Sequence, residues 1–292
     1  MRTEVTGADG VRIGAIVDGA GAADGAGAAG AVGADGEAGG RPPVIVFVHG
    51  WAQSADAWQL QLADPRLAGE FRLVAMDLRG HGRSGVPADG YDDPRVWADD
   101  LAAVLELAGT PAVVVGWSYG GLVITDYLRV HGTAGLAGVV YAGAITELGR
   151  DHPGGAVGPA MQAALPEALS PDDDVARPAV QRLCGGMTAG SDGASLVDDI
   201  LAVPAHVRAG LFRRDIGSAE VLEAVDVPAL VLHGESDAVV DITAAEYAAG
   251  KIPGARKRWL PGVGHLPFAE EAKTFGDELA AFARDAYRKV NR

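Results

Sequence analysis

The residues best suited to chemistry are Ser118 and the two glycines around it in Gly116-Trp117-Ser118-Tyr119-Gly120. The β-branched run at 113–115 before this segment and the apolar, helix-like pattern after it predict a strand, a sharp turn and a helix. Such a turn would hold the Ser118 hydroxyl above the sheet, where flanking side chains have no room. The helix would also point unpaired N–H groups and its positive dipole end at whatever Ser118 attacks.

The Gly-x-Ser-x-Gly pattern is weak evidence when taken alone. The chain has 42 glycines and eight serines among 292 residues, so about 0.17 such matches are expected by chance. A serine hydroxyl also needs a base to take its proton. The interpretation therefore depends on the elements around Ser118 and on partners further along the chain.

Strands that alternate with helices predict a mostly parallel sheet covered on both faces. An N-terminal hairpin is predicted over 2–17, with its turn at Asp9-Gly10. The other strands are predicted at 44–48, 71–76, 113–115, 137–142, 227–232 and 256–260. The helices are predicted from Ser54 to Leu62, Pro94 to Leu107, Tyr119 to Gly132 and Thr243 to Ala249, with a last helix ending near Tyr287.

Two segments interrupt this rhythm. Residues 18–40 are almost pure Gly and Ala with a few acids, which predicts a flexible surface loop. Prolines punctuate short apolar patches from 147 to 215, which predicts a helical lid inserted into the domain. The predicted organisation is a core over 1–146, the lid over 147–215 and the rest of the core over 216–292.

Composition narrows the kinds of partner. A net charge of −15 argues against nucleic acid or an anionic membrane, and 48% hydrophobic residues can bury a large core. The single cysteine, Cys184, cannot form an intramolecular disulfide and is interpreted as a bystander. No signal peptide or apolar membrane span is evident, so we expect a soluble cytoplasmic protein that acts on a small molecule.

Five pieces of the sequence, in order, resemble the α/β-hydrolase family. They are His49-Gly50-Trp51, the loop from Asp77 to Gly85, the segment around Ser118, His233-Gly234-Glu235-Ser236-Asp237, and Gly264-His265. The resemblance implies an α/β-hydrolase fold, a mostly parallel sheet flanked by helices with an inserted helical lid. It covers nearly all of the chain except the Gly/Ala-rich loop and the details of the lid.

The resemblance also implies a role for each site residue. Ser118 is the nucleophile, His265 the base and Asp237 the acid that orients it. The backbone N–H groups of Trp51 and Tyr119 would form the oxyanion hole.

Several residues have alternative interpretations. Glu235 and Asp241 rival Asp237 as the acid, and His265 could instead cap the last helix. His49, His81 and His233 are interpreted as structural residues that bond to loop backbone. Asp77, Arg79 and Arg83 are interpreted as tying their own loop together. No metal-binding cluster, phosphate-binding loop or dinucleotide fingerprint is evident, so neither a metal nor a cofactor is expected.

The function predicted first is a serine esterase that cleaves a carboxylic ester or lactone through an acyl-enzyme. The spacing around Trp51 and the stretch 204–211 resemble the cofactor-free haloperoxidase and arylesterase branch, in which the same triad also makes peracids. Thioester or carbon–carbon bond hydrolysis and a non-catalytic binding protein remain alternatives. The lid would decide specificity through residues that either line a pocket or form its own core, namely Met161, Met187, Leu201, Leu211 and Phe212.

Overall fold

A computed structural model describes residues 1–21, 42–188 and 194–290. Within them, eight strands form a single sheet in the order β1-β2-β4-β3-β5-β6-β7-β8. The first three in this order pair antiparallel and all the other neighbours pair parallel. The strands are β1 (Arg2–Thr6), β2 (Arg12–Gly19), β3 (Val44–Val48), β4 (Arg72–Met76), β5 (Ala112–Trp117), β6 (Leu136–Ala142), β7 (Ala229–Gly234) and β8 (Arg256–Leu260).

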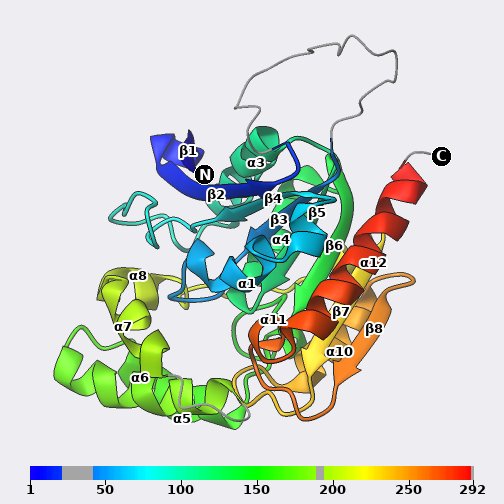
Figure 1. Cartoon of the computed structure of the whole chain (residues 1–292). Helices are drawn as coiled ribbons and strands as arrows, with labels where there is room; N and C mark the ends of the chain where they lie inside the picture. The colour runs from blue at the N-terminus through cyan, green and yellow to red at the C-terminus, as the bar shows by residue number, and fades with distance from the viewer. Residues whose placement is uncertain (22–41, 189–193, 291–292) are drawn as a thin grey trace, which may run out of the picture.

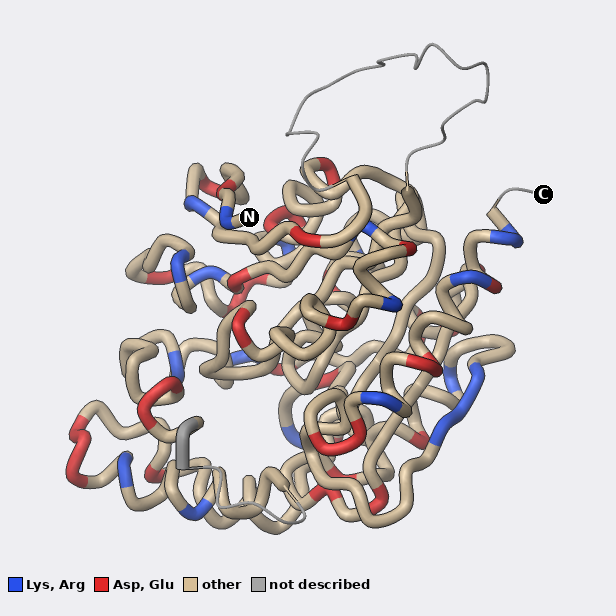
Figure 2. Tube along the Cα trace, viewed as in Figure 1, with Lys and Arg blue, Asp and Glu red and all other residues tan. Residues whose placement is uncertain are grey.

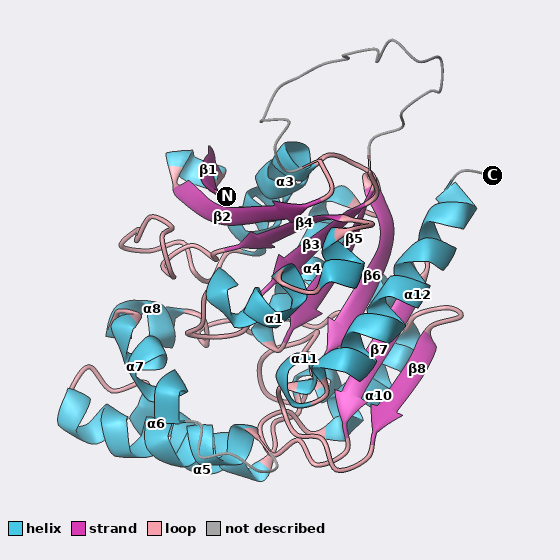
Figure 3. Ribbon diagram, viewed as in Figure 1, coloured by secondary structure: helices cyan, strands magenta, loops and turns pink. Residues whose placement is uncertain are grey.

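Helices lie on both faces of this sheet (Figure 1, Figure 3). Those of the core are α1 (Gln59–Leu62), α2 (Pro65–Ala68), α3 (Pro94–Ala108), α4 (Tyr119–His131), α9 (Ala219–Glu223), α10 (Ile242–Lys251), α11 (Pro267–Glu270) and α12 (Ala272–Val290). The described residues also form short 3-10 turns in the core and at the start of the insert: η1 (Ala8–Gly10), η3 (Ala55–Trp58) and η4 (Pro153–Gly155).

The central strands are buried along their whole length, as their continuous apolar runs predict. Every residue of β3, β5 and β6 is buried, because helices cover both faces of a parallel sheet. Local signals begin and end α3 where the sequence predicts. The Asp93 carboxylate accepts the Arg95 N–H at the start of α3, and Gly109, with φ of 96°, ends the helix.

The structure corrects the type of one predicted element and the start of another. The helix predicted from Ser54 to Leu62 is a 3-10 turn, η3, followed by the short helix α1; Ser54 does cap η3 by accepting the Asp56 N–H. The predicted loop 18–40 begins too early, because Asp18 and Gly19 pair with Leu73 and Arg72 as the last residues of β2. Residues 22–40 of that loop lie outside the described part of the chain.

Between β6 and α9, the described residues form four further helices. They are α5 (Pro159–Ala168), α6 (Asp173–Met187), α7 (Ala194–Ala202) and α8 (Ala205–Gly210). Figure 1 shows them grouped at the end of the sheet toward which the arrows of β6 and β7 point. We refer to residues 147–215 as the insert.

A buried carboxylate holds the two ends of the insert together. Glu147 accepts hydrogen bonds from the N–H groups of Gly154 and Ser218 and from the Tyr247 hydroxyl. Beside it, Leu148 and Ile216 pair as an isolated antiparallel bridge. The insert therefore leaves and re-enters the core at one place.

Basic residues gather along one edge of this acidic protein. Arg256, Lys257 and Arg258 are exposed on the edge strand β8, and Arg288 and Lys289 are exposed near the end of α12 (Figure 2). Charged residues on an edge strand discourage pairing with another sheet. Among the described helices, none is both long and apolar enough to cross a membrane.

A buried ion pair fixes the loop that follows β4. Arg79 donates to both carboxylate oxygens of Asp100 at 2.7 and 2.9 Å, and each side chain is 1% exposed. Asp100 also accepts the Ala8 N–H from the N-terminal hairpin. Asp77 accepts the N–H groups of Ala55 and Arg83. Asp77 and Arg79 therefore tie this loop to its neighbours.

Replacing one partner of the buried ion pair tests how much the pair contributes to the stability of the fold. We expect Arg79→Met to lower the free energy of unfolding by about 3–5 kcal/mol, because it leaves Asp100 buried without its cation. Arg284→Met is the matched control. It breaks the bidentate surface pair with Glu70, and exposed pairs contribute little. Urea unfolding would measure both, and equal effects of the two substitutions would contradict this assignment.

Candidate active site

The turn between β5 and α4 holds Ser118 in a strained conformation. Its φ and ψ are 54° and −121°, a region that residues other than glycine rarely adopt. A Cβ at Gly116 would lie 2.6 Å from the Gly120 carbonyl oxygen, and one at Gly120 would lie 2.3 Å from the Val48 oxygen. Only glycine fits at either position, so the packing forces the turn on which Ser118 sits.

His265 and Asp237 are brought together directly. His265 Nδ1 lies 2.8 Å from Asp237 Oδ2, and both side chains are 1% exposed. The other carboxylate oxygen, Asp237 Oδ1, accepts the N–H groups of Val239 and Val240. Burial opposes ionisation of Asp237, but the charge and hydrogen bond of His265 outweigh it, so the pKa of this carboxyl is lowered. A charged Asp237 can therefore orient the imidazole.

The rival acids lie elsewhere. Asp241 caps α10 by accepting from the N–H and the hydroxyl of Thr243, and Glu235 is exposed. His265 does not cap α11 either, since the residue at that N-cap is Leu266, whose own side chain makes no capping hydrogen bond.

The sequence analysis missed three hydrogen bonds that hold the main chain at 264–266. Glu270 accepts the N–H groups of Gly264 and Leu266, on either side of the histidine. The His265 N–H donates to the Met187 carbonyl at the end of α6, at 2.7 Å. The histidine is thus anchored to its own loop and to the insert. Glu270 is the last residue of the four-residue helix α11, and no pattern in the sequence analysis marked it.

Trp117 connects Ser118 to the histidine. Its indole N–H donates to the His265 carbonyl at 2.9 Å, and its ring centroid lies 5.4 Å from that of the imidazole. Among the hydrogen bonds of the described residues, none joins the Ser118 hydroxyl to His265. Such bonds are often long before substrate binds. The structure therefore places the three residues at one edge of the sheet and shows the His265–Asp237 contact directly.

The loop after β3 brings the backbone N–H group of Trp51 toward the same edge of the sheet as Ser118. A Cβ at Gly50 would lie 2.9 Å from Ser118 Cβ, so the main chain at 50–51 lies against the serine. In the part of the chain that the structure describes, the Trp51 N–H has no acceptor. The first N–H groups of a helix, including that of Tyr119 in α4, lack partners within the helix. Both N–H groups can thus serve a ligand.

Two buried histidines hold this loop in place, as the sequence analysis predicts. His81 Nε2 accepts the Ala52 N–H, while its Nδ1 donates to the Arg79 carbonyl. His49 accepts the Leu78 N–H and donates to the Gly50 carbonyl. Burial lowers the pKa of His81 to about 3 and that of His49 to about 4, so both rings are neutral near pH 7. They act as structural hydrogen-bonding groups.

His233 is a buried neighbour of Asp237. Its Nε2 lies 3.1 Å from the Val240 carbonyl oxygen and 3.4 Å from Asp237 Oδ2. Burial raises the pKa of the Cys184 thiol to about 12, which leaves it unreactive. No group of three or more His, Cys, Asp or Glu side chains within the described residues is placed to hold a metal ion.

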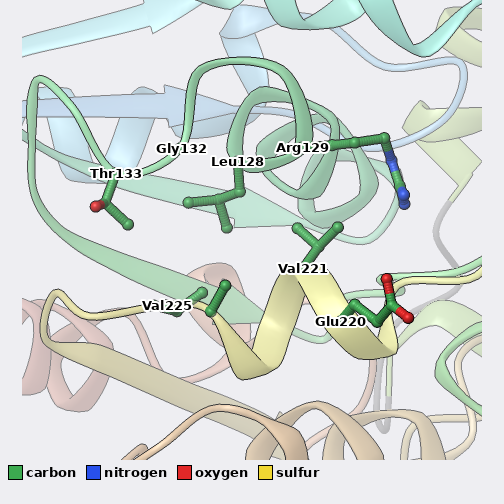
Figure 4. Close-up of a pocket in the computed structure, with 8 residues that line it drawn as sticks. Leu128, Arg129, Gly132, Thr133, Glu220, Val221 and Val225 are labelled. Carbon is green, nitrogen blue, oxygen red and sulfur yellow. The ribbon is translucent and has the colours of Figure 1, made fainter.

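A cavity of about 250 Å³ lies between α4 and α9 (Figure 4). It is lined by Leu128, Arg129, Gly132, Thr133, Glu220, Val221, Ala224 and Val225. None of these residues belongs to the site around Ser118. Two of its polar side chains already have partners, since Arg129 donates to the Gly217 carbonyl and Thr133 to Asp226.

Comparison with known proteins identifies the family. Residues 45–278 match the alpha/beta hydrolase family. A non-heme haloperoxidase of Rhodococcus erythropolis is 31% identical over 83% of this chain and 92% of its own length. A bifunctional esterase/perhydrolase of Acinetobacter calcoaceticus is 32% identical over the same shares. Among solved structures, an esterase from Rhodococcus sp. ECU1013 is 39% identical with a TM-score of 0.86, covering 97% of this chain and 98% of that one.

The chain therefore belongs to the alpha/beta hydrolase family. The mostly parallel sheet, flanked by helices, confirms the fold class that the sequence predicts, and the relatives confirm the resemblance to the esterase and haloperoxidase branch.

The close packing behind Ser118 can be tested with two glycines. Gly120→Ala should lower the free energy of unfolding by about 1–3 kcal/mol or more, because the new methyl group would overlap the Val48 carbonyl. Gly185→Ala in α6 is the matched control, since its new Cβ meets nothing within 4 Å. It should raise stability by about 0.5–1 kcal/mol. Chemical denaturation measures both, and a neutral Gly120→Ala would show that the turn is not constrained by sterics.

Proposed function

We propose that this protein is a serine hydrolase that cleaves carboxylic esters or lactones. Ser118 Oγ attacks the carbonyl carbon while His265 takes its proton, and the N–H groups of Trp51 and Tyr119 stabilise the oxyanion. Collapse of the tetrahedral intermediate releases the alcohol, which receives the proton from His265. A water molecule then gives its proton to His265 and attacks the acyl-enzyme, which releases the acid and restores Ser118.

The observation that carries this proposal is the buried His265–Asp237 hydrogen bond beside the strained turn at Ser118. Binding alone needs neither an oriented imidazole nor a nucleophile in a left-handed conformation. The unpaired N–H of Trp51 adds a donor where charge would develop. Together these groups supply a nucleophile, a base, an orienting acid and an oxyanion site.

The relatives support ester chemistry. The names of the Acinetobacter calcoaceticus relative and of the Rhodococcus structure include esterase activity. Pimeloyl-[acyl-carrier protein] methyl ester esterases, such as that of Vibrio atlanticus, are also about 30% identical to this chain. These shared names favour hydrolysis of an ester over cleavage of a carbon–carbon bond.

We also propose that the insert, residues 147–215, acts as a lid over a core formed by 1–146 and 216–292. The Met187 carbonyl holds the main chain of His265, and the Phe212 ring packs edge-on against Trp51 at 5.7 Å. Met161, Met187 and Leu211 are buried, while Leu201 and Phe212 are partly buried. The side chains of Phe212 and Leu201 are therefore the better candidates to contact an acyl group.

Perhydrolysis is the second candidate, and the bifunctional esterase/perhydrolase relative favours it. In that reaction hydrogen peroxide replaces water. Its oxygen attacks the acyl-enzyme carbonyl, its proton passes to His265, and the products are a peracid and free Ser118. Both reactions use the same acyl-enzyme.

Removing the nucleophile tests the proposal. Ser118→Ala should reduce the hydrolysis of p-nitrophenyl acetate by at least about 10³-fold, because no acyl-enzyme can form. The variant should remain folded, since the hydroxyl makes no hydrogen bond with the described residues. Ser54→Ala, which removes only a cap on η3, is the control and should keep its activity. Full activity in Ser118→Ala would sink the proposed mechanism.

A further inference from the structure

We propose that the segment Arg208–Arg214 of the insert positions the oxyanion hole. This inference rests on the proposed function, in which the N–H groups of Trp51 and Tyr119 stabilise the oxyanion. Trp51 lies in the loop after β3, and Tyr119 is the first residue of α4. The polar ends of both side chains nevertheless bond to this one segment of seven residues.

The Trp51 side chain is fixed by the first half of the segment. Its indole N–H donates to the Arg208 carbonyl at 3.0 Å, and its ring contacts that of Phe212. Trp51 is 4% exposed. The Trp51 N–H is therefore held from two directions, by this side-chain contact and by the His81 hydrogen bond to Ala52 on the main chain.

The Tyr119 side chain is fixed by the second half. Its hydroxyl donates to the Leu211 carbonyl at 3.2 Å and accepts from Arg214 Nη1 at 3.1 Å. Arg214 Nη2 in turn donates to Asp126 of the same helix, α4, at 2.6 Å. Both members of this ion pair are fully or almost fully buried. Arg214 thus clamps the first turn of α4, where the Tyr119 N–H begins the helix.

The segment is itself built into the insert. The buried Arg208 guanidinium donates to the carbonyls of Val203 and Ser170 at 2.8 and 3.1 Å. These acceptors follow α7 and α5, so one side chain joins three parts of the insert. Any shift of the insert would move the contacts of both oxyanion residues together.

Such coupling matters because the donors must match the transition state closely. Oxyanion donors act at about 2.7–3.1 Å from the developing charge, and removal of one costs about 10²–10³ in kcat. The network is not arranged for stability alone. Arg214 Nε and Asp126 Oδ2 are buried without partners among the described residues, and unpaired buried polar atoms are costly.

The first test deletes one hydroxyl. Tyr119→Phe keeps the ring and the backbone N–H but loses both bonds to the segment. We expect kcat for p-nitrophenyl acetate to fall about tenfold with KM unchanged, since only the transition state needs the donor. The Ki of phenylboronic acid, which forms a tetrahedral adduct with serine, should rise by a similar factor. Tyr127→Phe is the control, because its hydroxyl bonds to the Ala134 carbonyl outside the insert.

A second variant distinguishes loss of positioning from a folding defect. Arg214→Met with Asp126→Asn removes the ion pair as a unit, which is tolerated better than loss of one partner. It should lower kcat and raise the boronate Ki as Tyr119→Phe does. Wild-type kcat and Ki in the folded variants, or a change in KM alone, would overturn the positioning role while leaving the proposed function intact. Wild-type protein without esterase activity would overturn both.

Discussion

The close packing of three backbone segments behind Ser118 is the constraint on which the rest of the site depends. β3, the turn at Ser118 and the start of α4 approach so closely that Gly50, Gly116 and Gly120 leave no space for a side chain. Because β3 and β5 are neighbouring parallel strands, their carboxyl ends bring the Trp51 loop and the serine to the same edge. The same contact forces the left-handed conformation of Ser118. One steric arrangement thus sets the positions of Ser118 and of the backbone N–H groups beside it.

Hydrogen bonds to backbone supply the precision that packing alone does not. His81 and His49 hold the Trp51 loop, Glu270 holds the His265 loop, and the Val239 and Val240 N–H groups hold Asp237. Buried polar groups of this kind are stable only when they are paired, so each fixes one geometry. The insert joins this scaffold through the Met187 carbonyl and the segment Arg208–Arg214. The insert therefore shares hydrogen bonds with the site and forms part of its geometry.

Much of this could be predicted from sequence because the signals are local. Short apolar runs marked β3, β5 and β6, and Pro94 and Gly109 marked the ends of α3. The pairing of Asp237 with His265 was expected from the resemblance to the α/β-hydrolase family. Glu270, Arg208 and Arg214 could not be found in this way, because their partners are backbone groups or side chains far along the chain. Arg214 and Asp126 are 88 residues apart. A periodic pattern in the sequence cannot predict a contact between a residue of the insert and a helix of the core.

The central claim is that Ser118 is the nucleophile and that His265 and Asp237 activate it. Incubation of the full chain with diisopropyl fluorophosphate, followed by peptide mass spectrometry, tests this claim most directly, because the reagent phosphorylates an activated serine and releases fluoride. We expect one adduct per chain, on the peptide that contains Ser118, and a much lower labelling rate in His265→Ala. An adduct on another residue, no adduct, or equal labelling rates in the two proteins would contradict it.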